Sequence, residues 1–324
     1  MTRSSGASSA PESDSPAPVA IVGATATGKT AVGILLAEAL GAEIIGCDSR
    51  QVYRRLDIGS AKPTPAERAR VRHHLVDVAD PDERYSAARY RDAVRALLPD
   101  LAARGRRPIF VGGTGLYLRA ASEGLCPAPP GIPGLRRWLA ALAGTVPGGL
   151  HPLLARVDAP AAARIHPNDR FRLTRALEVF YLSGRTITEH QRGQTKPAGY
   201  QPRAFAIELD GAAVRRRIDR RLDAMMEAGF LEEARGLLES GIDPGLPALR
   251  AVGYPELFSH LRGEMTLDES LAAIRRASWQ YARRQLTWFR AEPGVEWIPA
   301  AAETSAAGLA ETIIRRLGDT GRAT

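Results

Sequence analysis

The chain has 324 residues, enough for two domains, and a formal net charge of +8. No run of eighteen apolar residues occurs, which excludes a membrane-spanning helix, and the early residues lack the apolar segment of a secretion signal. We therefore expect a cytoplasmic protein with a disordered tail over 1–17. The two cysteines, Cys47 and Cys126, form no metal-binding pair. The positive charge suits a polyanionic partner, or else a solvated basic surface.

A glycine-rich loop over 23–30 follows the apolar run 19–22 and precedes a helical pattern over 31–40. This is the context that G-x-x-x-x-G-K-[ST] requires, because inward-facing amides and a helix N-terminus attract an anion. It predicts a di- or triphosphate site in which Lys29 reaches the terminal phosphates and Thr30 holds Mg²⁺. The alternative is a chance glycine turn. The predicted binding residues are Gly23, Ala24, Thr25, Ala26, Thr27, Gly28, Lys29 and Thr30.

Lysine is rare in this chain, because only three of its 44 basic residues are lysine and the others are arginine. One of the three is Lys29 of the phosphate loop, where a compact ammonium acts differently from a planar guanidinium. By the same reasoning Lys62 is a position of interest.

Before residue 122 the sequence predicts three further strands, over 43–47, 73–77 and 107–111. It also predicts a helix over 85–104. This alternation of strands and helices indicates a doubly wound parallel sheet. Asp48 directly follows a strand, and polar residues in that position face the ligand crevice of a parallel sheet. Asp48 is therefore expected to face the phosphate site, although a helix-capping role fits the local sequence equally well.

A proline-rich connector over 126–133 ends the alternating pattern. Residues 135–194 have helical patterns without a strand, and strands return at 203–209 and 295–298. We predict an α/β fold of the P-loop NTPase type, a parallel sheet core with an inserted all-helical domain. The predicted bounds are 18–124 and 200–316 for the core and 125–199 for the insertion.

A long helix is predicted over 267–290. Three apolar residues recur every seven positions and predict a buried stripe: Ile274, Tyr281 and Trp288. Three arginines have the same spacing on roughly the opposite face: Arg276, Arg283 and Arg290. Such a row suits a phosphate backbone, and a solvated charged face is the commoner alternative.

Taken together, several stretches resemble the tRNA dimethylallyltransferases, the IPP transferase family, in order and spacing. They are 23–30, 48–53, 57–63, 111–117, 165–169, 175–178, 252–254 and 284–288. The resemblance spans about residues 18–300. It departs at Ala24, where the family pattern has proline, a change expected to affect loop stiffness more than chemistry.

The resemblance implies transfer of a dimethylallyl group from dimethylallyl pyrophosphate to N6 of adenine 37 in tRNA. The phosphate loop then holds a leaving diphosphate instead of ATP, with Mg²⁺ and Lys29 stabilising the developing charge. Asp48 is the expected general base for N6, and Thr114 is the family's other residue near that amine. Two arginines, Arg217 and Arg221, are candidates for further diphosphate contacts. The alternative is that they belong to an ordinary exposed row of arginines.

The resemblance also assigns tRNA contacts, with the helical insertion gripping the anticodon stem-loop. The residues are Asp48, Ser49, Arg50, Gln51, Thr114, Arg136, Phe171, Arg172, Leu173, Thr174, Arg175, Arg250, Gly253, Tyr254, Arg283, Arg284, Gln285, Trp288 and Arg290. The expected partners are therefore tRNA and dimethylallyl pyrophosphate, with no membrane, for a monomeric protein.

Other functions share part of this pattern. A small-molecule kinase shares the phosphate loop but does not need a large helical insertion, and an adenylate isopentenyltransferase uses the same donor with a free nucleotide as acceptor. A non-catalytic RNA-binding protein with a nucleotide switch does not account for Asp48 beside Lys29 and Thr30. A terpenoid-type prenyltransferase is excluded, because the chain has no adjacent pair of aspartates.

Overall fold

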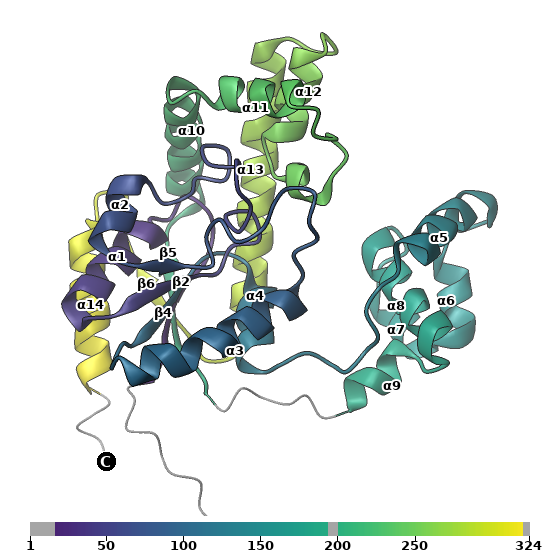
Figure 1. The fold of residues 1–324 in the computed structure, drawn as a ribbon, viewed down its shortest axis with the longest axis horizontal. Coiled ribbons are helices and arrows are strands. Elements are labelled where there is room, and N and C mark those ends of the chain that lie inside the picture. Colours follow the sequence, from purple (N-terminus) through teal and green to yellow (C-terminus); the bar gives the residue numbers. More distant parts are fainter. Residues whose placement is uncertain (1–16, 194–199, 320–324) are drawn as a thin grey trace, which may run out of the picture. The chain divides into compact units, whose positions relative to one another are not determined.

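The computed structural model describes residues 17–193 and 200–319 (Figure 1). The chain divides into two compact units, one within Met1–Ser122 and Ala198–Thr324, the other within Glu123–Pro197. The tail predicted over 1–17 lies, apart from its last residue, outside the described residues. No helix of the described part is both long enough and apolar enough to cross a lipid bilayer.

The first unit is built on a six-stranded parallel sheet with the strand order β3-β2-β4-β1-β5-β6. The strands are β1 (Val19–Val22), β2 (Glu43–Gly46), β3 (His73–His74), β4 (Pro108–Val111), β5 (Arg203–Glu208) and β6 (Val295–Pro299). The predicted parallel α/β core is confirmed. Since β1 pairs with β4 on one side and β5 on the other, the loop that follows β1 lies at the middle of the carboxyl edge.

One predicted strand is much shorter than expected. The prediction covered 73–77, whereas the structure has only His73–His74 in β3. Leu75 and Asp77 have φ angles of 59° and 57°, in the left-handed region, so the chain turns away from the sheet after His74. Hydrophobic content alone did not reveal this turn.

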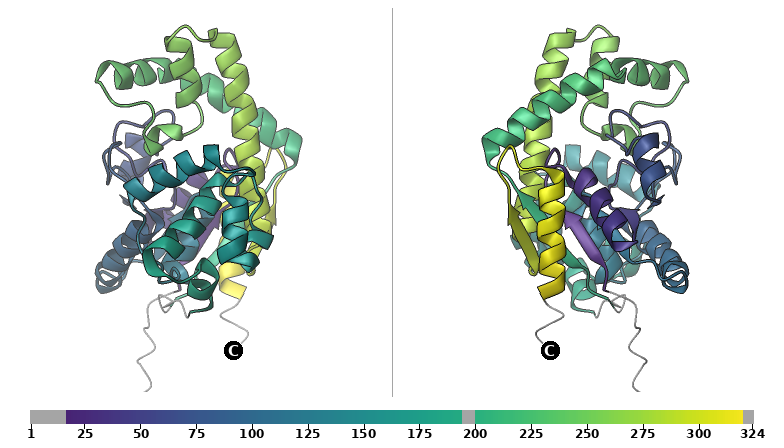
Figure 2. Two further views of the ribbon diagram at one scale, coloured as in Figure 1. Left: turned by 90° about the vertical axis from the view of Figure 1, so that its right-hand side faces the viewer. Right: turned by 90° about the vertical axis from the view of Figure 1, so that its left-hand side faces the viewer.

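Helices cover both faces of the sheet (Figures 1 and 2). On one face lie α1 (Lys29–Leu40) and α14 (Ala306–Asp319), and on the other lie α3 (Ala87–Ala103) and α4 (Gly115–Ser122). Alternate strand residues enter the two cores, because side chains alternate along a strand. Ile21 packs on the α1 side and Ala20 on the α3 side. All residues of β1, β2 and β4 are buried, as in other parallel sheets covered twice.

Further helices of this unit extend past the carboxyl edge of the sheet (Figure 1). They are α10 (Gly211–Glu227), α11 (Phe230–Glu239), α12 (Tyr254–Leu261) and α13 (Leu267–Arg290), with the 3-10 helix η1 (Pro247–Arg250). The short α2 (Pro65–Arg70) lies beside α1, where Arg70 pairs with Glu38. Thr266 and Glu269 form a capping box that starts α13 at the predicted residue. The three arginines of its predicted row are exposed, and Ile274 is buried. Tyr281 and Trp288 are only half-buried.

All described elements of the second unit are helical: α5 (Pro133–Thr145), α6 (His151–Val157), α7 (Ala159–Arg164), α8 (Arg170–Ser183) and α9 (Ile187–Arg192). They enclose a separate apolar core that includes Leu139, Leu154 and Leu173. Glu178 of α8 is fully buried and accepts hydrogen bonds from Arg136 at 2.8 and 2.9 Å and from Arg175 at 2.9 Å. This buried carboxylate therefore joins α5 to α8.

Candidate functional site

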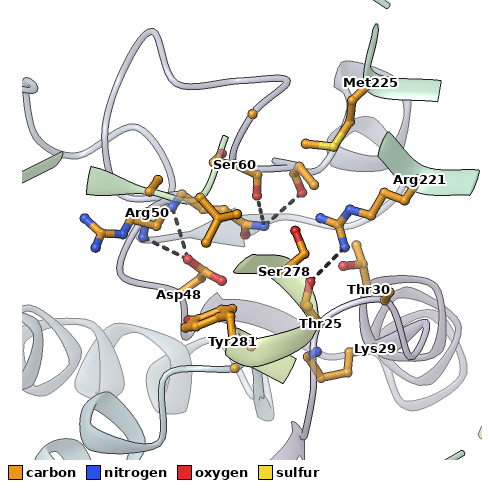
Figure 3. Close-up of a pocket in the computed structure, with 18 of the residues that line it drawn as sticks. Thr25, Lys29, Thr30, Asp48, Arg50, Ser60, Arg221, Met225, Ser278 and Tyr281 are labelled. Atoms are coloured by element: carbon orange, nitrogen blue, oxygen red, sulfur yellow. Dashed lines mark hydrogen bonds between the residues drawn. The ribbon is translucent and has the colours of Figure 1, made fainter. Parts of the chain in front are cut away.

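A pocket of about 320 Å³ lies at the carboxyl edge of the sheet in the first unit (Figure 3). Its walls come from the phosphate loop, the segment after β2, the loop over 59–63 and the helices α10 and α13. The residues that line it include Thr25, Lys29, Thr30, Asp48, Gln51, Ser60, Arg221, Tyr281 and Gln285. The fold thus brings the phosphate loop and Asp48 to a single space.

The phosphate loop is held in shape by its own backbone. Gly23 and Gly28 have φ angles of 119° and 93°, which L side chains rarely adopt. The carbonyl oxygen of Ala24 accepts hydrogen bonds from Lys29 Nζ and, at 3.0 Å, from Thr27 Oγ1. Gly23, Ala24, Thr27 and Gly28 therefore shape the loop. The predicted loop residues that line the pocket are Thr25, Ala26, Lys29 and Thr30.

Two cations face each other across this loop. Arg221 Nη1 donates to Thr25 Oγ1 at 3.3 Å. Burial, together with the Arg221 charge, lowers the pKa of Lys29 to about 7, and the Asp48 carboxylate partly offsets this. Burial also lowers the pKa of Arg221 from its ordinary value. A bound anion relieves both penalties, so the pocket is suited to a phosphate group.

Arg217, the other predicted diphosphate ligand, supports the loop from outside. Its guanidinium donates to the carbonyl of Thr27 at 3.3 Å and to that of Ala302 at 3.0 Å. Both bonds go to backbone carbonyls, so Arg217 acts on the shape of the loop, whereas Arg221 lines the pocket.

Asp48 both caps a turn and lines the pocket. Its Oδ1 accepts from the amides of Arg50 at 2.8 Å and Gln51 at 3.4 Å. The chain beyond it forms turns and not a helix, so the helix-capping alternative is replaced by a turn cap. Among the described residues both bonds go to Oδ1, which leaves Oδ2 for a ligand.

Thr114 acts on this segment through the backbone. Its Oγ1 accepts from the amide of Ser49 at 3.0 Å, and its own amide donates to the carbonyl of Cys47 at 3.1 Å. The neighbouring Gly112 has no room for a side chain, because a Cβ there would lie 2.0 Å from the Cys47 carbonyl oxygen. The loops after β2 and β4 are therefore fastened on both sides of Asp48.

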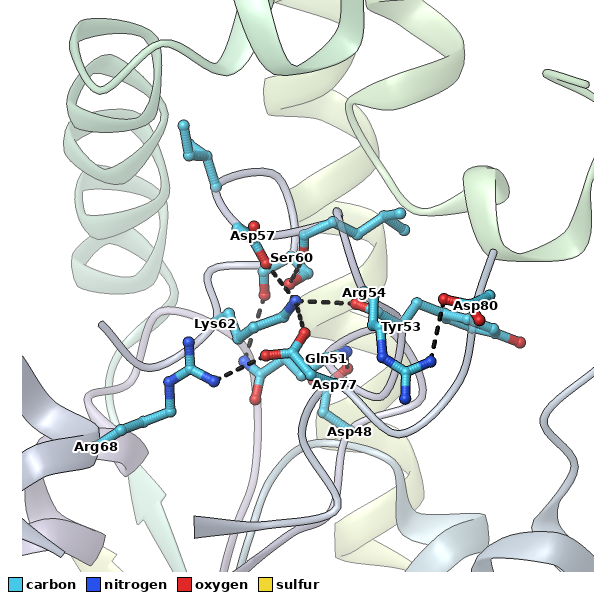
Figure 4. A network of polar contacts seen from close by, with 12 residues as sticks. Asp48, Gln51, Tyr53, Arg54, Asp57, Ser60, Lys62, Arg68, Asp77 and Asp80 are labelled. Carbon is cyan, nitrogen blue, oxygen red and sulfur yellow. Dashed lines mark hydrogen bonds and ion pairs between the residues drawn. The ribbon is translucent and has the colours of Figure 1, made fainter. Parts of the chain in front are cut away.

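Lys62 is a structural lysine (Figure 4). Its side chain is 2% exposed, and its ammonium forms ion pairs with Asp57 and, at 2.5 Å, with Asp77. It also donates to the carbonyl of Tyr53 at 2.9 Å. This network holds the loop over 57–63, whose residues Gly59, Ser60, Ala61 and Pro63 line the pocket.

Sequence reasoning missed Glu233 of α11, which holds the same loop from the other side. Its carboxylate accepts from the amides of Asp57, Ile58 and Gly59 at 2.8 to 3.0 Å. It also accepts from the hydroxyl of Tyr254 at 2.7 Å. A glutamate on an amphipathic helix carries no local signal of such partners.

Sequence reasoning also missed several residues that line the pocket: Ile218, Leu222, Met225, Phe230, Ile274, Ser278 and Tyr281. Burial and the nearby Asp48 charge raise the pKa of the Tyr281 hydroxyl to about 12.

By the exposure of their side chains, the predicted tRNA contacts fall into three groups. Three have little or no exposed surface: Leu173, Tyr254 and Gln285, which are 1%, 0% and 5% exposed. Gly253 is also buried, with a φ of 107° and no room for a Cβ beside Phe230. Arg250, Arg283, Arg284 and Arg290 are exposed in the first unit, and Phe171 and Arg172 in the second. The half-buried residues are Asp48, Ser49, Arg50, Gln51, Thr114, Arg136, Thr174, Arg175 and Trp288.

We expect Lys62→Met to lower the free energy of unfolding by about 2 kcal/mol, because it leaves two carboxylates without their shared cation. The exposed pair of Arg54 with Asp80 provides the control, since Arg54→Met should cost less than about 0.5 kcal/mol. Urea denaturation of both variants measures the difference. Equal losses would show that the Lys62 network does not stabilise the loop.

The lowered pKa of Lys29 predicts proton uptake when inorganic pyrophosphate binds. At about pH 8 the free ammonium has largely lost its proton, and a bound anion raises its pKa again. Calorimetry in Mg²⁺-free buffers of different ionisation enthalpy should show uptake of up to one proton at about pH 8 and little at about pH 6. Lys29→Arg, which stays charged, should remove the uptake. Uptake that persists in this variant would assign it to another group.

Comparisons with known proteins show the family to which this chain is similar. The model of the family described as IPP transferase matches residues 51–292. A tRNA dimethylallyltransferase of Syntrophobacter fumaroxidans is 46% identical over 303 residues, which cover 93% of this chain and 88% of that protein. One of Methylococcus capsulatus is 45% identical over 300 residues, 91% of this chain and 95% of the relative.

Solved structures extend the likeness to the fold. The tRNA isopentenylpyrophosphate transferase of Bacillus halodurans aligns with a TM-score of 0.69 at 36% identity, over 94% of this chain and 98% of that one. A eukaryotic dimethylallyltransferase, described as acting on tRNA, aligns with a TM-score of 0.77 at 25% identity, over 95% of this chain and 80% of its own.

Proposed function

The chain belongs to the IPP transferase family and is a prenyl transferase that modifies tRNA, and we propose that its acceptor atom is N6 of adenine 37. The donor is dimethylallyl pyrophosphate, and the products are N6-isopentenyladenosine and pyrophosphate. One observation carries the proposal. A single pocket combines Lys29 and Arg221, which suit a diphosphate, with the carboxylate of Asp48.

The donor diphosphate fits between the phosphate loop and α10. Cleavage of the allylic C–O bond leaves negative charge on the departing oxygen, and Lys29 and Arg221 are placed to stabilise it. Thr30 lines the pocket and would hold Mg²⁺, which supplies further charge stabilisation. The described residues contain no cluster of three His, Cys, Asp or Glu for a metal. The hydroxyl oxygen of Thr30 is a hard ligand of the type that Mg²⁺ prefers, so this residue fits the ion.

Apolar side chains favour a prenyl donor over ATP. Ile218, Leu222, Met225 and Ile274 line the same pocket as the phosphate loop. Each buried CH₂ group contributes roughly 0.8 kcal/mol to binding, so a five-carbon tail gains affinity from such a wall. These residues therefore support the prenyl transferase reading over the kinase alternative.

Asp48 is the proposed general base for the acceptor. As the bond between N6 and the allylic carbon forms, Oδ2 takes a proton from N6, and the diphosphate leaves with the electron pair of the C–O bond. Thr114 holds this segment through the Ser49 amide. Adenine must leave its stack to enter the pocket, at a cost of roughly a few kcal/mol that protein contacts must offset.

Exposed cationic and aromatic residues are the proposed tRNA surface. In the first unit they include Arg283 and Arg290 of α13, and in the second unit Phe171, which is 76% exposed. Arginines suit phosphates, and an exposed ring can stack on an unpaired base. The proposed partner is the anticodon stem-loop, bound by a monomer in the cytoplasm.

The proposal is tested with radiolabelled dimethylallyl pyrophosphate and unmodified tRNA, with AMP and ATP as competitors. Label should appear on adenine 37 and be insensitive to AMP. Label on AMP would favour the adenylate isopentenyltransferase alternative, and phosphoryl transfer from ATP would favour the kinase.

Asp48→Asn should lower the transfer rate by about 10²- to 10⁴-fold, because it removes the base. The amide oxygen of Asn can still accept from Arg50 N, so the turn and tRNA affinity should persist. Single-turnover kinetics and filter binding measure the two effects. Asp80→Asn, an exposed site paired with Arg54, is the matched control. A near-normal rate for Asp48→Asn would refute the base assignment.

Arg283→Ala should weaken tRNA binding and reduce the slope of log K against log salt by about 0.9, the value for one phosphate contact on a duplex. Arg275 of the same helix is the control. It is paired with Asp219 and Asp223, so Arg275→Ala should leave the slope unchanged. An unaltered slope in Arg283→Ala would mean that this face of α13 does not meet tRNA.

A further inference from the structure

Gln285 lies in a stretch of the sequence that was predicted to contact tRNA, yet its side chain is buried. It is 5% exposed, whereas the preceding Arg283 and Arg284 are exposed. A buried amide must find hydrogen-bond partners within the protein, because an unpaired one costs about 1 to 3 kcal/mol. The contacts of Gln285 therefore indicate what this side chain does.

Both ends of the Gln285 amide bind backbone atoms of the site. Its Oε1 accepts from the amide of Thr25 at 2.7 Å, and its Nε2 donates to the carbonyl of Gly113 at 2.9 Å. The approach is close, since a Cβ at Gly113 would lie 2.0 Å from Nε2. One planar group thus spans the loops that follow β1 and β4.

These two loops carry the two halves of the proposed reaction. The Thr25 loop contains Lys29, which faces the diphosphate. The Gly113 loop continues to Thr114, whose hydroxyl accepts from the amide of Ser49, next to Asp48. Gln285 therefore forms a side-chain link between the donor loop and the loop that holds the segment of the base.

The bond to Gln285 also changes what the phosphate loop offers. The amide of Thr25 donates to Oε1, so we expect that it does not donate to the bound diphosphate. The charge of the leaving group then depends more on Lys29 and Arg221. Gln285 thus uses one amide of the phosphate loop for a hydrogen bond that fixes this loop to α13.

We propose that Gln285 is a positioning residue that sets the separation between the departing diphosphate and the acceptor amine, and that it does not contact tRNA. The inference rests on the proposed function. Displacement of reacting groups by about 1 Å can cost 100-fold in rate, so a link between the two loops acts on turnover more than on binding.

The test compares Gln285→Leu and Gln285→Glu with Arg283→Ala. Leu removes both bonds at similar volume, and Glu keeps the acceptor for Thr25 N but cannot donate to Gly113 O. We expect kcat to fall about 100-fold for Leu and at least about tenfold for Glu, with KM for tRNA within about threefold of wild type. Arg283→Ala should show the reverse, a raised KM with kcat retained.

A coupled variant tests the path through Thr114. If Gln285 acts by placing that loop, Gln285→Leu should cost much less in a Thr114→Ala background than in wild type. Thermal melting shows whether each variant is folded. If Gln285→Leu does not fold, Gln285→Glu takes its place in the comparison.

Three outcomes are distinguishable. Wild-type protein that transfers no prenyl group refutes the proposed function itself. Active wild type, with Gln285 variants that lose tRNA affinity and keep kcat, overturns the positioning role. Independent, multiplicative losses in the Gln285 and Thr114 variants also overturn it.

Discussion

Backbone hydrogen bonds between loops at the carboxyl edge of the sheet determine the rest of the site. The amide of Gly112 donates to the carbonyl of Ile21 at 3.1 Å, and the amide of Thr114 donates to that of Cys47 at 3.1 Å. The loop after β4 thereby touches both the end of β1 and the end of β2. Because parallel strands end at one edge, these bonds bring the phosphate loop and Asp48 into one pocket.

At this edge the pocket is lined by charges of opposite sign. In the proposed reaction, Lys29 and Arg221 contact the departing diphosphate, and the Asp48 carboxylate accepts the proton of the amine. The walls are fixed by separate polar groups, Lys62 on one side of the loop over 57–63 and Glu233 on the other. Rigid placement of charge before substrate binds is the main source of electrostatic catalysis.

Local pattern was enough to predict the elements and the phosphate loop, because strand, glycine turn and helix are adjacent in the chain. It failed where distant segments meet. Tyr254 was assigned to tRNA from its motif, but its hydroxyl binds Glu233 and it is fully buried. Glu233 itself gave no signal, since its backbone partners lie some 175 residues away. The short β3 reflects left-handed residues that hydrophobicity does not encode.

In the proposed reaction, one pocket holds the departing diphosphate and, opposite to it, the carboxylate that receives a proton from the amine. The most direct measurement is a crystal structure with an unreactive thio analogue of the donor and an anticodon stem-loop. We expect diphosphate oxygens on Lys29 and Arg221, and an allylic carbon about 3.5 Å from N6 with Asp48 beside that amine. A diphosphate bound elsewhere, or an allylic carbon turned away from Asp48, would contradict it.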